Sequence, residues 1–81
     1  MYTYIIKSNI TNKYYIGSTQ NIEERLSQHN AGLTRSTKHG IPWKIIYYEV
    51  CLTKSESLKK EKLWKSYKGG NAFKKLLGSV A

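Results

Sequence analysis

Two tyrosines near the N-terminus have the spacing of side chains that share one face of a β-hairpin. If Asn9–Asn12 forms the turn, Tyr4 lies opposite Gly17 and Ile6 lies opposite Tyr15. Side chains alternate along a strand and cross-strand partners share a face, so Tyr4 and Tyr15 become diagonal neighbours beside the space left by Gly17. Two phenols therefore flank a gap, although strand tyrosines also pack at the edge of a core with their hydroxyl groups in solvent.

An arginine and a histidine are one helical turn apart in the next segment. On a helical wheel His29 falls inside the apolar stripe of Ile22 and Leu26, and Arg25 borders that stripe. The guanidinium fork grips phosphate oxygens, and an imidazole accepts or relays a proton near neutral pH. The pair could face one ligand. The alternative is a core histidine beside an arginine whose stem packs along the surface.

A single acid stands among many lysines in a later segment. Helical spacing places Glu61 between Leu58 and Trp64 on the packing side. Burying a lone carboxylate is costly unless a positive group meets it, and a divalent cation is one candidate. An ion pair within the helix, from Glu61 to Lys65, is the alternative.

The segment Lys68–Lys75 is basic and carries aromatic side chains. This composition suits phosphate contacts and base stacking, although it is also that of a solvated surface. The candidate nucleic-acid contacts are Lys65, Lys68, Asn71, Lys74 and Lys75.

A small α+β fold is needed to bring these side chains together. Asn21 precedes Glu24, and Thr53 precedes Glu56, in the pattern that starts helices. We predict one domain over residues 1–81 with the order ββαβαα, a three-stranded antiparallel sheet flanked by helices. The predicted strands are Tyr2–Lys7, Lys13–Ser18 and Trp43–Val50, and the predicted helices are residues 22–31, 54–67 and 71–77.

Composition limits the chemistry and the partners. The 81 residues carry 14 Lys plus Arg against 5 acids, a net charge of +9, and every acid is a glutamate. Aspartate clusters that hold two metal ions are therefore excluded. Nucleic acid is the natural partner of such a chain, because each cation that neutralises a phosphate releases a counterion.

The remaining features indicate a cytoplasmic protein without disulfides. Cys51 is the only cysteine, so we expect a buried, inert thiol with no disulfide partner. No apolar run approaches the roughly 20 residues that span a bilayer, and the N-terminal segment lacks a basic leader. We expect no membrane association, and the sequence does not fix the oligomeric state.

In their order along the chain, these residues resemble the GIY-YIG nuclease family, especially its small single-domain members. The resemblance rests on Tyr4, on Tyr15-Ile16-Gly17, on Arg25 with His29, and on Glu61. It covers nearly the whole chain. Only the tyrosine of the first signature is kept, because the chain reads Tyr2-Thr3-Tyr4, and Asn71 is the one candidate for a late asparagine of many members.

The resemblance implies a Mg²⁺-dependent endonuclease, with Mn²⁺ as a substitute, that hydrolyses phosphodiester bonds in DNA. Tyr4 and Tyr15 would be the signature tyrosines, one of which activates or positions the attacking water. Arg25 would stabilise charge on the phosphoryl oxygens beside His29, Glu61 would be the sole acidic metal ligand, and Gly17 would have a structural role. The alternative is a non-catalytic nucleic-acid-binding module with the same fold.

Overall fold

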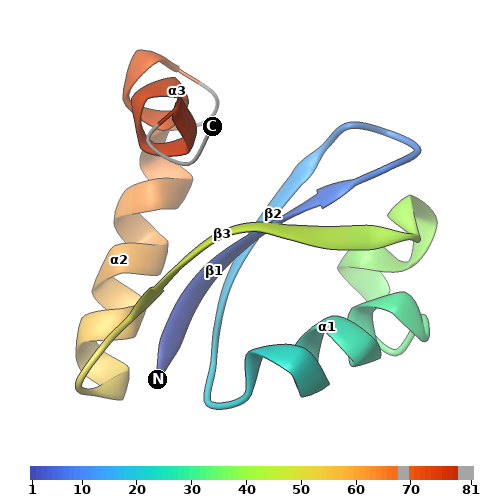
Figure 1. Cartoon of the computed structure of the whole chain (residues 1–81), viewed down its shortest axis with the longest axis horizontal. Helices are drawn as coiled ribbons and strands as arrows, with labels where there is room; N and C mark the ends of the chain where they lie inside the picture. The colour runs from blue at the N-terminus through green and yellow to red at the C-terminus, as the bar shows by residue number, and fades with distance from the viewer. Residues whose placement is uncertain (68–69, 79–81) are drawn as a thin grey trace.

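The computed structural model describes residues 1–67 and 70–78 and has the predicted α+β fold. A three-stranded antiparallel sheet, in the order β2-β1-β3, lies between helices on its two faces (Figure 1). The order ββαβαα is confirmed, with one short 3₁₀ helix (η1) that the sequence did not predict. The elements are β1 (Tyr2–Ser8), β2 (Tyr14–Thr19), α1 (Ile22–Asn30), η1 (Arg35–Gly40), β3 (Trp43–Val50), α2 (Lys54–Tyr67) and α3 (Asn71–Gly78).

The hairpin has the register expected from its turn. Tyr4 pairs with Gly17 and Ile6 pairs with Tyr15 across β1 and β2. Strand β1 is the central strand, and its pairing with β3 shifts between Ile5 and Ile6. The outer edges of the sheet are therefore β2 and β3.

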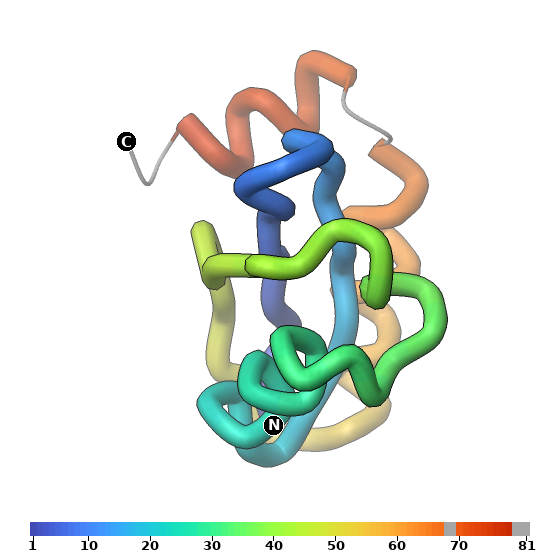
Figure 2. The backbone as a smooth tube through the Cα atoms, turned by 90° about the vertical axis from the view of Figure 1, so that its right-hand side faces the viewer, coloured from blue at the N-terminus to red at the C-terminus, as the bar shows by residue number. Residues whose placement is uncertain are grey.

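Alternation along β1 divides the core between the two faces of the sheet. Tyr4 and Ile6 pack with Trp43 on the face that α1 covers. Ile5 packs with Trp64 and Phe73 on the face that α2 and α3 cover. Figure 2 shows α1 in front of the sheet and α2 behind it. A residue therefore belongs to the α1 face or the α2 face according to its parity on the strand.

Both long helices begin at the predicted caps. The side-chain oxygen of Asn21 accepts a hydrogen bond from the backbone N–H of Glu24 at 3.0 Å. Thr53 Oγ1 accepts from the backbone N–H of Glu56 at 3.1 Å. These bonds satisfy N–H groups that have no partner within the first turn.

The packing face of α2 differs from the predicted one. Trp64 is buried as expected, but Leu58 is 46% exposed and is no anchor. Ser57 takes its place, because its hydroxyl lies 2.8 Å from Thr3 Oγ1 and donates to the backbone oxygen of Tyr2 at 3.0 Å. A small hydroxyl residue lets the helix approach β1 closely, which apolar periodicity alone does not predict.

Cys51 is a buried free thiol, 3.6 Å from Thr3 Oγ1, as predicted. None of the helices in residues 1–67 and 70–78 has the length and apolar character needed to cross a lipid bilayer.

Candidate functional site

A chain of hydrogen bonds runs through the core on the α1 face. The hydroxyl group of Tyr4 lies 2.9 Å from Nε2 of His29. The other ring nitrogen, Nδ1, lies 2.8 Å from Oγ1 of Thr37 in η1. Tyr4, His29 and Thr37 are each no more than 2% exposed. The imidazole is therefore held at both nitrogens in a position that solvent hardly reaches.

The direction of these bonds follows from Thr37. Its hydroxyl group donates to the backbone oxygen of Thr34 at 3.3 Å, so its oxygen is left to accept the Nδ1–H of His29. Nε2 then carries no proton and accepts the hydroxyl proton of Tyr4. Thr37 is a site residue that sequence reasoning missed, because the α1–β3 connection has no periodicity that would mark one threonine as buried.

The environment keeps His29 neutral. Burial, together with a smaller contribution from the charge of Arg25, lowers the pKa of His29 from 6.5 to about 4. The neutral imidazole uses its Nε2 lone pair to accept a hydrogen bond from the Tyr4 hydroxyl group, and its lowered pKa keeps it unprotonated at neutral pH. The histidine on the apolar face of α1 is thus a core residue that also orients the Tyr4 phenol.

Arg25 and Tyr15 lie beside Tyr4 at the open side of this core. The pKa of Arg25 is raised, first by hydrogen bonding to Tyr4 and also by Tyr15. Its Nη1 donates to the side-chain oxygen of Gln28 at 2.9 Å. The ring of Tyr15 is 6.4 Å from that of Tyr4 and 4.9 Å from that of His29, centre to centre. The four predicted side chains of the α1 face therefore form one cluster.

The two tyrosines differ in their access to solvent. Burial raises the pKa of Tyr4, and Arg25 opposes that change. Tyr4 is only 2% exposed, whereas Tyr15 is half-buried. A water molecule or a phosphate can therefore reach the hydroxyl group of Tyr15 more readily than that of Tyr4.

Gly17 does not leave the gap that the sequence predicted. The ring of Tyr4 lies over it, and a Cβ atom at position 17 would be 2.6 Å from the hydroxyl oxygen of Tyr4 and 3.1 Å from the ring of Tyr15. That expectation was wrong in its geometry, because the inward tyrosine fills the space. Glycine is needed there so that both phenol rings can pack against β2.

Glu61 approaches the same strand from α2. Its Oε1 accepts a hydrogen bond from Ser18 Oγ at 2.9 Å, and its Oε2 lies 2.7 Å from Nζ of Lys65. The ion pair that the sequence left as an alternative is thus present. The Glu61 charge also contributes to the raised pKa of Tyr4, so the carboxylate and the phenol are coupled electrostatically.

The donor set around Glu61 fits a hard cation with few protein ligands. Among the residues that the structure describes, no three His, Cys, Asp or Glu side chains are grouped to hold a metal ion. The side chain of Glu61 is 21% exposed. Mg²⁺ keeps several waters and uses one or two carboxylates with substrate phosphates, which is compatible with one accessible carboxylate.

The predicted nucleic-acid contacts are spread along α2 and α3. Lys65 is exposed beside Glu61, and Asn71, Lys74 and Lys75 are exposed on α3. Lys68 lies outside the described residues. The structure therefore brings Lys65 to the candidate site but keeps the α3 residues on a neighbouring element.

The geometry defines a small domain in which paired tyrosines, an Arg/His helix and one glutamate converge on an edge strand. The family model described as the GIY-YIG catalytic domain matches residues 1–74. The chain therefore belongs to the GIY-YIG family, whose members are generally nucleases.

Curated relatives are similarly small proteins. A UPF0213 protein of Staphylococcus haemolyticus is 39% identical over 74% of this chain and 73% of its own length. A UPF0213 protein of Listeria welshimeri is 40% identical over 76% of this chain and 69% of its own. A UPF0213 protein of Streptococcus pyogenes serotype M3 is 32% identical over 83% of this chain and 73% of its own length. The comparison with solved structures gives no significant match.

Proposed function

We propose that the protein is a metal-dependent endonuclease that hydrolyses phosphodiester bonds in DNA. The observation that supports this most strongly is the bond from Tyr4 to a neutral, buried His29, next to Tyr15 and Arg25. The neutral imidazole accepts the Tyr4 hydroxyl proton in a hydrogen bond and so orients that phenol beside Tyr15 and Arg25. Membership of a nuclease family and the net charge of +9 support a nucleic-acid substrate.

The proposed roles follow from exposure and charge. Tyr15 is the more accessible phenol and orients the attacking water, while Arg25 holds the phosphoryl oxygens. The water oxygen bonds to phosphorus as the bond to the leaving ester oxygen breaks, and that oxygen takes a proton from solvent. The proton lost by the water goes to solvent, and the hydrogen bond from Tyr4 to Nε2 of His29 holds the Tyr4 phenol in position.

Glu61 would hold Mg²⁺, or Mn²⁺ in its place, from α2. When bound there, the cation would supply Lewis-acid stabilisation of charge on the phosphoryl group. Ser18 fixes one carboxylate oxygen, so the other oxygen, now paired with Lys65, is the one free to change partners.

The proposal is tested by cleavage of supercoiled plasmid and of a branched DNA in the presence of Mg²⁺. We expect Glu61→Gln and Arg25→Ala to lower kcat by about 100-fold or more. Matched controls are the exposed residues Glu23 and Arg35, and Glu23→Gln and Arg35→Ala should cleave like the wild type. Wild-type cleavage by the Glu61 and Arg25 variants would overturn the assignment.

A second measurement distinguishes an enzyme from a binding module. If the wild type binds DNA with strong salt dependence but cleaves none of the substrates, the domain binds nucleic acid without catalysis. Mn²⁺ binding followed by electron paramagnetic resonance gives a readout independent of turnover. Glu61→Gln should lose that binding and Glu23→Gln should keep it.

A further inference from the structure

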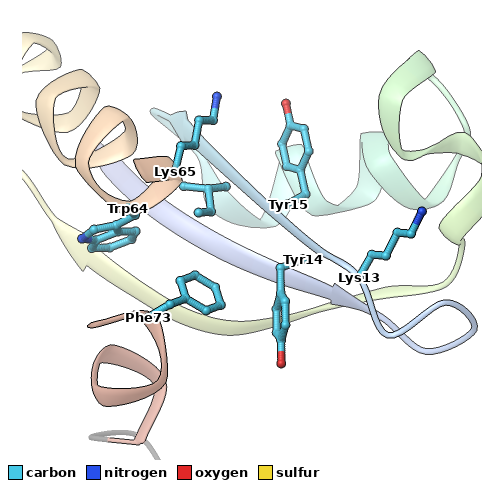
Figure 3. Close-up of a pocket in the computed structure, with 7 residues that line it drawn as sticks. Lys13, Tyr14, Tyr15, Trp64, Lys65 and Phe73 are labelled. Atoms are coloured by element: carbon cyan, nitrogen blue, oxygen red, sulfur yellow. The ribbon is translucent and has the colours of Figure 1, made fainter. Parts of the chain in front are cut away.

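A hollow lies along the outer edge of β2, beside the candidate site and not explained by the proposed chemistry. Its volume is ≈ 480 Å³, within the range of ligand pockets. In Figure 3, Trp64 and Phe73 lie beside the strand from α2 and α3, while Tyr14 and Tyr15 leave β2 in opposite directions. We call this hollow the β2 groove; its lining residues are Lys13, Tyr14, Tyr15, Ile16, Trp64, Lys65 and Phe73.

The floor of the β2 groove is apolar and its wall is aromatic. Ile16, Trp64 and Phe73 are each no more than 8% exposed, so they form a packed base. Tyr14 stands above it at 43% exposure. Its ring meets that of Phe73 edge to face, with centres 5.1 Å apart and planes at 71°. The contact holds the Tyr14 ring in a fixed orientation while leaving part of it accessible.

The rim of the β2 groove is cationic. Lys13 is exposed at one side, and Lys65, whose side chain is 53% exposed, stands on the other. Lys7 does not line the groove, but its ammonium group lies 5.6 Å from the centre of the Tyr14 ring. Among the residues that the structure describes, no acidic side chain lines the groove. An occupant should therefore combine a flat apolar body with negative charge on either side of it.

The β2 groove also continues into the candidate site. Lys65 lines the groove and pairs with Glu61, and Tyr15 lines the groove while its ring packs against His29. The groove and the cluster of Tyr15 and His29 therefore meet at the edge strand β2, and a nucleic-acid strand that crosses this edge can contact both. The groove and the candidate site could therefore hold neighbouring nucleotides of one substrate strand.

We propose that the β2 groove binds an unpaired nucleobase of the substrate strand, with its flanking phosphates on Lys13 and Lys65. This inference rests on the proposed function, because it assigns a substrate class to the same site. A base offers the flat π-face and its backbone the adjacent negative charges, whereas a paired duplex keeps its base faces stacked. The preferred substrates are therefore single-stranded, flapped or branched nucleic acids.

The test measures binding without cleavage, in EDTA, by fluorescence anisotropy. The probes are a labelled oligothymidine of about 15 nucleotides, an abasic strand of the same length and charge, and a blunt duplex. We expect wild type to bind oligothymidine about tenfold more tightly than the abasic strand. Equal affinity for these two probes would overturn the proposal without needing any variant.

Matched variants locate the effect. Tyr14→Ala should remove the preference for oligothymidine over the abasic strand, and Tyr14→Trp should keep it. Tyr48 is the control, because it is 51% exposed on the other edge strand and packs edge to face with Tyr2 as Tyr14 does with Phe73. Tyr48→Ala should bind like the wild type.

Lysine variants separate the phosphate contacts from the base contact. Lys13→Ala should weaken binding to oligothymidine and the abasic strand alike, and more than Lys44→Ala, which removes an exposed lysine of β3. If Tyr14→Ala and Tyr48→Ala both lose the preference for oligothymidine, or if neither loses it, the base binds elsewhere. Base-selective binding without any cleavage would contradict the nuclease proposal and leave the groove assignment standing.

Discussion

Neutral His29 carries one ring proton, which can be on Nδ1 or on Nε2. The hydroxyl group of Thr37 determines which nitrogen carries it. The Thr37 hydroxyl group donates its proton to the backbone oxygen of Thr34, so its oxygen accepts the hydrogen bond from Nδ1–H of His29. The same arrangement leaves Nε2 facing Tyr4. Thr37 is thus a positioning residue: it fixes the His29 ring, and His29 in turn orients the Tyr4 phenol.

Replacing Thr37 tests this positioning role. Thr37→Val keeps the volume but leaves Nδ1–H without an acceptor, so we expect kcat for cleavage to fall about tenfold with little change in KM. Thr37→Ser keeps the hydroxyl group and should restore the rate. Imidazole ¹⁵N NMR gives a readout independent of activity, in which the wild type carries the proton on Nδ1. An unchanged ¹⁵N signature in Thr37→Val would refute the role.

The buried, neutral His29 predicts a particular pH dependence of stability. Its pKa is about 4 when folded and 6.5 when unfolded, so the unfolded state binds a proton that the native state refuses. The contribution of neutral His29 to the free energy of unfolding is fully present above about pH 6.5 and is lost as the pH falls toward 4. Below pH 4 the titration of His29 causes no further change. The total loss is at most about 3 kcal/mol. Urea unfolding between pH 7.5 and 5 measures the first and larger part of this loss, before most carboxylates titrate.

The chain offers a matched control for that measurement. His39 is exposed on η1 and is the only other histidine. His39→Gln should keep the wild-type pH slope, and His29→Gln should flatten it. A wild-type free energy of unfolding that does not change between pH 7.5 and 5 would show that His29 is not held neutral.

Among the elements, α1 is fixed to β3 by one asparagine side chain. Asn30 Nδ2 donates to the backbone oxygen of Trp43 at 3.0 Å, and its Oδ1 accepts from the Trp43 N–H at 2.7 Å. An amide side chain thus pairs with the first residue of β3 as a neighbouring strand would. It fixes the end of α1 that carries His29.

We expect Asn30→Ala to lower the free energy of unfolding by about 1–2 kcal/mol, because it removes two backbone partners at once. Since His29 precedes Asn30 directly, the variant should also lower cleavage. Equilibrium denaturation in urea measures the stability change. The exposed Asn9, substituted as Asn9→Ala, is the control, and equal stability of the two variants would contradict the bridging role.

Several elements and contacts could be predicted because they depend on short-range patterns. The hairpin register follows from the length of its turn, and it fixed Tyr4 opposite Gly17. Helical spacing alone placed His29 in the core. The same reasoning failed where a contact depends on shape across elements. Ser57 against Thr3, and Thr37 against His29, are polar pairs that only the assembled fold brings together.

Across the whole molecule, the five glutamates are distributed so that one remains at the candidate site. Glu49 pairs with Lys60, and Glu56 accepts from the backbone of Leu52. Glu23 and Glu24 are exposed in the first turn of α1. Glu61 alone meets β2, through Ser18. In a chain with a net charge of +9, Glu61 therefore brings a carboxylate to this edge, with Lys65 as its ion-pair partner.

The division of the candidate site between the two faces of the sheet affects the protein while it is being made. A ribosome delivers Tyr4, Tyr15 and His29 with the first hairpin and α1, but Glu61 arrives only with α2. Ser18 on β2, which donates a hydrogen bond to Glu61, is made earlier and has no Glu61 to bond to until α2 is made. A growing chain thus carries the phenols and the imidazole before it carries the acid. The proposed nuclease site would therefore be complete only after α2 has been made and has docked against β2.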